Sequence, residues 1–219
     1  GYFTKAQLFA EAQMVLEPED PNLKRHYLLI LGHLGKVRKA LSIVRDLPAE
    51  EQDEYGNEHA YVLIKSARQL LGNLQNKLRS GEMIQASEIM ARAIKALARA
   101  RMLLEAKVAK YRVCDFKVLQ GAKKREVFRA FNLLSDIFEI QGIFYKSMDE
   151  NKEIEQNTNH WTLSFKYYRM ALVQATSAMR FGVESSGGKK FPLRKKYKSK
   201  HQRLLESLRG MLENIDVDQ

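Results

Sequence analysis

The chain has 219 residues, of which 45% are apolar and 29% charged, a composition typical of one large globular domain or two small ones. It contains only 4 Pro, 12 Gly and a single cysteine, Cys114, which excludes a turn-rich all-β fold, a low-complexity chain and an intramolecular disulfide framework. The 37 Lys and Arg residues against 26 Asp and Glu give a net charge of +11. This charge is compatible with nucleic acid, an anionic membrane surface or an acidic protein as partner.

Nothing in the sequence indicates secretion or a membrane span. No apolar stretch reaches the ~20 residues that a transmembrane helix needs. The first residues, Gly1 to Lys5, lack the composition of a signal peptide. A lone cysteine gives no argument for an oxidising compartment. We therefore expect an intracellular protein, either cytoplasmic or nuclear.

Apolar residues recur three and four positions apart along nearly the whole chain, which predicts an all-α fold. We expect about seven helices, arranged as a bundle or as a stack of helical hairpins. The first three predicted helices cover residues 4–16, 21–46 and 57–79. Asp20 is the predicted N-cap of the second, with Pro21 at its first position. The acidic run at 50–54 is predicted to be a connecting loop.

The fourth predicted helix has the most regular pattern in the sequence. Its apolar residues repeat every seven positions, at Met83, Met90, Leu97, Leu104, Tyr111 and Val118. Alanines occupy the second position of this seam, at Ala86, Ala93 and Ala100. This is the coiled-coil period, and alanine permits a close approach of the partner helix. We expect the third helix to fold back beside it through a short turn at Ser80–Gly81, with pairing between chains as the alternative.

The remaining helices are predicted to complete the core. The fifth, which ends near Met148, is apolar on more than one face, and such width is typical of a central helix. The sixth carries an aromatic-rich stripe from Trp161 to Met179, in which Tyr167 and Tyr168 point in different directions. We divide the chain into a helical bundle at 1–182, a flexible Gly/Ser linker at 183–191 and a basic C-terminal helix at 192–219 that docks on the bundle.

A dense basic cluster opens the last helix. Eight basic residues and no acidic one lie between positions 189 and 203: Lys189, Lys190, Arg194, Lys195, Lys196, Lys198, Lys200 and Arg203. Such arrays bind phosphate backbones, because each contact releases counterions. An apolar stripe from Tyr197 to Ile215 indicates that one side of the helix docks while the lysines face outward. The alternatives are a solvated helix face, a nuclear-import signal or a patch for anionic lipids.

A second basic region covers residues 77–129, where fourteen basic residues stand against five acidic ones. Arg92 and Arg99 are seven positions apart and therefore share one helix face, with Lys95 and Arg101 nearby. The alternative is an ordinary exposed helix face. If this face adjoins the C-terminal cluster, the two regions form one continuous positive surface.

We identify no catalytic residue, no cofactor-binding motif and no metal site in the sequence. The five histidines lack the spacing of a zinc protease, and no glycine-rich phosphate loop or nucleophile elbow is present. The six residues between Arg194 and His201 give a spacing that resembles the Arg-x4-6-His motif of HEPN-type ribonucleases, which are also all-helical. The resemblance implies that these two residues act on the ribose hydroxyl and the phosphate. Lys195 stands where that family usually has a small polar residue.

The function that we predict is that of a non-enzymatic helical scaffold. It binds a polyanion, in the first place the backbone of RNA or DNA, through the C-terminal cluster and the face of Arg92 and Arg99. Phosphate contacts of this kind position a nucleic acid without reading its bases. Two alternatives stay open: a protein–protein interaction adaptor built from helical hairpins, and a module that binds or tethers to an anionic membrane surface.

Overall fold

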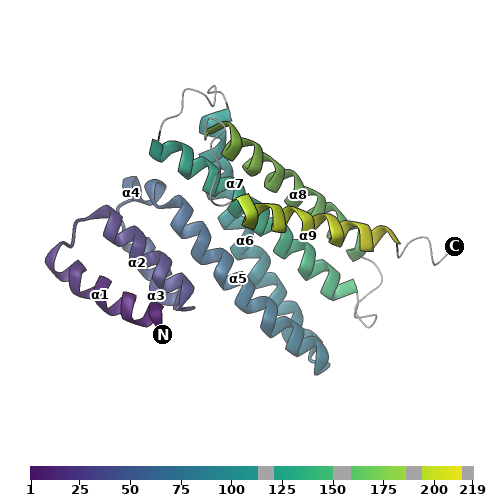
Figure 1. The fold of residues 1–219 in the computed structure, drawn as a ribbon. Coiled ribbons are helices and arrows are strands. Elements are labelled where there is room, and N and C mark those ends of the chain that lie inside the picture. The colour runs from purple at the N-terminus through teal and green to yellow at the C-terminus, as the bar shows by residue number, and fades with distance from the viewer. Residues whose placement is uncertain (113–120, 150–158, 186–193, 214–219) are drawn as a thin grey trace.

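The computed structural model describes residues 1–112, 121–149, 159–185 and 194–213 (Figure 1). These residues form nine helices and no strand, which confirms the predicted all-α fold. The first five helices are α1 (Tyr2–Leu16), α2 (Pro21–His33), α3 (Val37–Asp46), α4 (Ala49–Glu54) and α5 (Gly56–Arg79). The other four are α6 (Met83–Arg112), α7 (Gly121–Asp149), α8 (His160–Ser185) and α9 (Arg194–Glu213).

The prediction of one helix over 21–46 is wrong, because the chain turns between α2 and α3. Gly35 in this turn has a φ of +71°, a left-handed conformation that glycine adopts without steric cost. The Lys36 N–H donates to the Leu31 carbonyl at 2.9 Å, and the Gly35 N–H donates to the Gly32 carbonyl at 3.3 Å. This pair of hydrogen bonds defines a Schellman C-cap. The apolar stripe continues across the turn in sequence, so periodicity alone did not reveal it.

The turn between α5 and α6 is built in the same way. Gly81 has a φ of +73°, and the Glu82 N–H donates to the Lys77 carbonyl at 3.0 Å. The two helices then pack against each other, as the seven-residue repeat predicts. Five residues of the predicted seam are fully buried, whereas Met83 and Met90 are partly buried. The five are Ala86, Ala93, Leu97, Ala100 and Leu104. The small alanine side chains allow α6 to lie close to α5.

The N-terminal helices form a smaller core of their own. It gathers around Tyr27, Leu28 and Leu31 of α2, and Val62 joins it to α5. The loop predicted at 50–54 is wrong, because these residues belong to the short helix α4. Acidic side chains in a first turn are stabilised by the helix dipole, so an acidic run is compatible with a helix start.

Helix α7 lies at the centre of the C-terminal part of the molecule, as its width predicts. It packs against α5, α6 and α8 (Figure 1). Its buried apolar side chains point in several directions around the axis: Val127, Phe131, Leu134, Ile137, Phe138, Ile140 and Phe144. A helix with so many apolar faces is stable only when other helices cover each of them.

Small residues bring α7 and α8 together. The Ser164 hydroxyl donates to the Gly142 carbonyl at 2.9 Å, and a Cβ on Gly142 would lie 2.9 Å from the Tyr168 ring. Of the predicted stripe, Tyr168 and Ala175 are buried, whereas Trp161 and Phe165 are only partly buried. The small residues Ser164, Ala171 and Ala178 complete the buried face of α8. Neither of the paired tyrosines is exposed, since Tyr167 stacks on the α7 ring of Tyr145 at 5.4 Å.

Replacing Gly35 with alanine is expected to lower the free energy of unfolding by about 1–2 kcal/mol, the cost of a left-handed conformation for an L-residue. The added Cβ would also meet the Gln69 side-chain amide. Gly72→Ala is the control: nothing lies within 4 Å of a Cβ there, and alanine should stabilise α5 by about 1 kcal/mol. Urea denaturation measures both variants. A Gly35→Ala protein as stable as the wild type would contradict the left-handed turn.

Candidate polyanion-binding site

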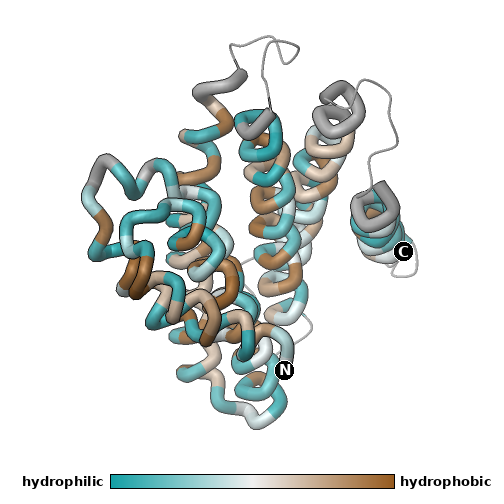
Figure 2. The backbone as a smooth tube through the Cα atoms, turned by 60° about the vertical axis from the view of Figure 1, so that its left-hand side comes forward, coloured by the Kyte–Doolittle hydropathy of each residue, from teal (hydrophilic) through white to brown (hydrophobic). Residues whose placement is uncertain are grey.

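An apolar stripe docks α9 on the rest of the protein. Leu204, Leu208 and Met211 are buried, and α9 packs against α8. The Met211 sulfur lies 3.9 Å from the Ser164 hydroxyl oxygen of α8. Figure 2 shows α9 as a largely hydrophilic helix at the outer edge of the molecule.

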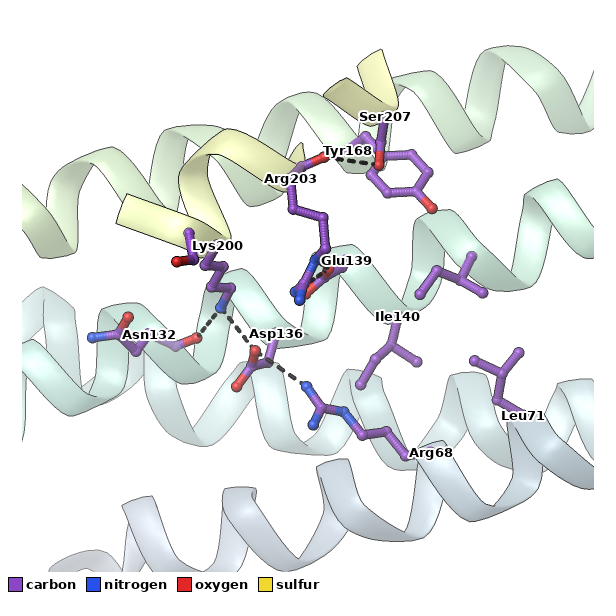
Figure 3. A pocket seen from close by; sticks show the side chains of 12 residues that line it. Arg68, Leu71, Asn132, Asp136, Glu139, Ile140, Tyr168, Lys200, Arg203 and Ser207 are labelled. Carbon is purple, nitrogen blue, oxygen red and sulfur yellow. Dashed lines mark hydrogen bonds and ion pairs between the residues drawn. The ribbon is translucent and has the colours of Figure 1, made fainter. Parts of the chain in front are cut away.

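Two basic residues of the predicted cluster point at α7 (Figure 3). Lys200 donates to the Asp136 carboxylate at 2.7 Å and to the Asn132 carbonyl at 3.2 Å, and its side chain is only 12% exposed. Arg203 donates to Glu139 through two nitrogens, at 3.1 and 2.6 Å. The Glu139 side chain is 9% exposed, whereas that of Arg203 remains 61% exposed. Both cations are therefore paired with carboxylates of α7, Lys200 in a largely buried position and Arg203 at the surface, and these ion pairs hold α9 against α7.

Asp136 also binds a third helix. Arg68 of α5 lies 3.2 Å from the same carboxylate oxygen that accepts from Lys200, so one acidic group joins α5, α7 and α9 (Figure 3). Sequence reasoning missed this docking site. The available signal was that Asp136 and Glu139 are the only acidic residues between positions 127 and 148, one turn apart on an apolar helix. Carboxylates in such surroundings require cationic partners.

A cavity of about 770 Å³ lies between α5, α7 and α9 (Figure 3). Leu71, Ile140 and Ile143 give it an apolar side, and the ion pairs of Asp136 and Glu139 give it a charged side. Its volume lies within the ~300–1,000 Å³ typical of small-molecule sites. Each of the three cations in its walls, Arg68, Lys200 and Arg203, is paired with one of the two carboxylates, which leaves the lining with one excess positive charge.

Of the other residues in the predicted cluster, the structure describes the side chain of Lys198 alone. Lys198 is exposed and forms no ion pair with any described residue. The structure gives only the backbone at the start of α9, which contains Arg194, Lys195 and Lys196. Lys189 and Lys190, like most of the predicted linker at 183–191, lie outside the described residues. The two residues that resemble a HEPN motif lie about two turns apart on α9. Arg194 is located by its backbone alone, whereas the His201 side chain is half-buried.

Three exposed cations follow one face of α6: Arg92, Lys95 and Arg99. None of them forms an ion pair within the described part of the chain. Arg101 belongs to another face, because its guanidinium lies 5.3 Å from the ring centre of Phe138 on α7. It also donates to Glu105 at 2.8 Å. We refer to the three exposed cations as the α6 basic face.

The two basic regions are not joined by direct helix packing. Helix α6 packs against α5 and α7, whereas α9 packs against α8 and reaches α7 through its ion pairs (Figure 1). Lys200 and Arg203 face this junction, so they do not extend a positive surface toward α6. The α6 basic face therefore stands as a separate positively charged surface.

Arg99 of this face acts electrostatically on a buried histidine of α5. Burial in the first place, and the charge of Arg99 in the second, lower the pKa of His59 from 6.5 to about 4. The unfolded chain takes up this proton near pH 6.5, whereas the folded protein takes it up only near pH 4. The stability contributed by neutral His59 is therefore complete above pH 6.5 and is lost as the pH falls toward 4.

No family model, no curated protein and no solved structure matches this chain. Among the residues that the structure describes, no three His, Cys, Asp or Glu side chains are grouped so that they could hold a metal ion. In the same ranges, no helix has both the length and the apolar character that crossing a membrane requires. The arrangement of charges and pockets is thus the basis for a functional interpretation.

Asp136→Asn is expected to loosen α9 and to lower the free energy of unfolding by about 1–3 kcal/mol, because it leaves Lys200 and Arg68 without their shared anion. Hydrogen exchange should rise in the described part of α9 more than in α5. Glu105→Gln is the control, since it removes an exposed pair with Arg101 that is worth about 0.3–0.5 kcal/mol. Equal effects of the two substitutions would contradict the docking role of Asp136.

Arg99→Gln is expected to raise the pKa of His59 from about 4, because it removes the second cause of the lowered value. The value should stay below 6.5, since burial of the imidazole remains. A pH titration of the His59 ring signals by NMR measures the change. Arg92→Gln, one heptad earlier, serves as the control and should leave the titration unchanged; a His59 midpoint near 6.5 in the wild type would show that the ring is not buried.

Proposed function

We propose that this protein is a non-enzymatic helical scaffold that binds a polyanion, RNA or DNA, by its phosphate backbone. The observation that supports this proposal is the α6 basic face, whose three cations are exposed and unpaired within the described residues. Unpaired cations in one row bind successive phosphates without first breaking an internal ion pair. They also release counterions from the nucleic acid on binding.

Helix α9 contributes less to this surface than its sequence predicts. Lys200 and Arg203 are committed to Asp136 and Glu139, and recruiting them would uncover two carboxylates on α7. Lys198 is exposed and unpaired within the described residues, and Lys195 and Lys196 lie beside it in the same helix. We propose that these lysines form a secondary contact for the same strand.

Contacts of this kind position a nucleic acid through its phosphates and do not read its sequence. Arginine and lysine side chains on a convex helix face donate to phosphate oxygens and are indifferent to base identity. Affinity should therefore fall steeply as salt rises, with a slope of about 0.9 for each phosphate neutralised on a duplex. We propose that the protein acts inside the cell, where nucleic acid is available to it.

A protein–protein adaptor is the second candidate, and α1 supplies the observation that favours it. This helix leaves large apolar side chains exposed: Tyr2, Leu8, Phe9, Val15 and Leu16. Contiguous exposed apolar residues are typical of protein contact surfaces. Binding through this face would depend weakly on salt, in contrast to binding through the α6 basic face.

Reversing the α6 basic face with the triple substitution Arg92→Glu, Lys95→Glu and Arg99→Glu is expected to weaken binding of a 20-nucleotide RNA at least a hundredfold at low salt. The magnitude follows from three lost phosphate contacts and three new repulsions. Fluorescence anisotropy measured across a salt series reports both the affinity and the salt slope, which should become shallower. Circular dichroism checks that the variant is folded.

A matched control changes the net charge by the same amount elsewhere. Lys5, Arg38 and Arg45 are exposed on α1 and α3, and their replacement by glutamate should weaken binding much less. Lys195→Glu, Lys196→Glu and Lys198→Glu together test the secondary contact on α9. RNA binding that survives both the α6 and the α9 triple substitutions would overturn the proposal, and preferential binding to anionic vesicles would favour the membrane alternative.

A further inference from the structure

A second pocket lies between α2, the start of α5 and the first half of α7, and no residue of the basic C-terminal cluster lines it. Its volume is about 230 Å³. Three arginines from two different helices line it: Arg25 from α2, with Arg125 and Arg129 from α7. The buried amide of Asn57 lines it from α5. None of these residues belongs to the α6 basic face, so the inference drawn from them does not depend on the proposed function.

The two glutamates of this pocket are already neutralised. Glu58 accepts from Arg129 at 2.6 Å, and Glu126 lies 3.6 Å from the ammonium group of Lys107. Glu58 is also nearly buried, at 5% exposure, so its carboxylate is fixed. These acids therefore hold the pocket in shape and do not repel an anion that enters it.

The remaining two arginines are available to a ligand. Arg25 approaches Glu54 only at 3.4 Å, and its guanidinium lies over the Tyr55 ring, 5.4 Å from the ring centre. The Nε of Arg25 is buried and has no hydrogen-bond partner among the described residues. Arg125 is exposed and forms no ion pair within the same ranges. Arg25 and Arg125 thus bring two guanidinium groups from different helices to one pocket, each with donors that no described residue uses, and guanidinium groups bind phosphate oxygens through charge-assisted hydrogen bonds.

Asn57 adds a hydrogen-bond acceptor to the arginine donors of this pocket. Only 2% of its surface is exposed, and its side-chain nitrogen donates to the Glu126 carbonyl at 3.2 Å. Its side-chain oxygen is buried without any donor among the described residues. A buried acceptor left unpaired is costly, and a phosphate dianion cannot satisfy it. A hydroxyl group next to the phosphate can.

We propose that this pocket binds the phosphate of a phosphorylated sugar, with Arg25 and Arg125 donating to the phosphate and Asn57 accepting from a sugar hydroxyl. Its volume is below the ~300–1,000 Å³ of sites for drug-sized ligands, which limits the enclosed part to the phosphate and the adjoining sugar. The same chemistry is offered by a free sugar phosphate and by the phosphorylated 5′ end of an RNA strand. The experiment below separates these two sources.

Titration of the full chain with ribose 5-phosphate, followed by NMR of arginine Nε–H and asparagine amide signals, should give saturable shifts at Arg25, Arg125 and Asn57. Arg125→Gln is expected to weaken binding at least tenfold, because a charge-assisted contact is lost while an exposed position is changed. Arg169→Gln, an exposed arginine on α8, is the matched control and should bind as the wild type does. Unsaturable shifts, or equal affinities of the two variants, would overturn the proposal.

Methyl phosphate tests the role of Asn57, because it carries the phosphate without a neighbouring hydroxyl. It should bind at least fivefold more weakly than ribose 5-phosphate, and equal binding would overturn the sugar assignment. A 5′-phosphorylated trinucleotide that shifts the same signals, where its 5′-hydroxyl form does not, identifies an RNA end as a source; shifts with ribose 5-phosphate alone identify a free sugar phosphate. The α6 triple variant should bind ribose 5-phosphate normally, which keeps this test separate from that of the proposed function.

Discussion

The constraint on which the rest of the structure depends is the need to cover α7. Its apolar side chains point around most of the helix axis, so no single partner can bury them. The hairpin of α5 and α6 covers one part of it, α8 covers another, and α9 lies across α7 through ion pairs. The small residues at the α7–α8 interface follow from the same need, because close approach is the only way to exclude water from a broad apolar surface.

Two acidic residues on this helix decide which of the basic residues remain available. Asp136 and Glu139 lie where α9 crosses α7; Asp136 pairs with both Arg68 and Lys200, and Glu139 pairs with Arg203. The three cations of the α6 basic face form no such ion pair within the described residues. The division between structural and available cations is thus set by the position of acids on a neighbouring helix, and net charge alone does not reveal it.

Most of the fold could be predicted from periodicity, because a helix that buries one face repeats its apolar residues every three to four positions. This holds for the α5–α6 pair and for the central position of α7. The failures have physical reasons. Gly35 ends α2 by adopting a backbone conformation that leaves the apolar spacing intact, and α4 forms where acidic residues suggest a loop. In α8, the predicted stripe contains Tyr168 and Ala175, which are buried, but the face with the deepest burial also includes Ser164, Ala171 and Ala178, small residues that counting large aromatic side chains passes over.

The candidate sites were less predictable than the fold. The exposed positions of Arg92 and Arg99 follow from helical spacing, since residues seven apart share a face. The pairing of Lys200 and Arg203 required knowledge of which helix α9 crosses. The pocket of Arg25, Asn57 and Arg125 joins residues as much as 100 positions apart, and no local pattern in the sequence indicates that they meet.

The separate core of the N-terminal helices has an electrical consequence. Residues 1–55 contain 7 Lys and Arg against 9 Asp and Glu, so the whole positive excess of the chain is carried by the remainder. A molecule with its charge divided in this way has an electric dipole moment whose positive end lies away from the N-terminal helices. In the field of a long polyanion it experiences a torque before contact, which turns the N-terminal helices toward the solvent. The exposed apolar residues of α1 would then be presented outward on a bound molecule, open to a second partner.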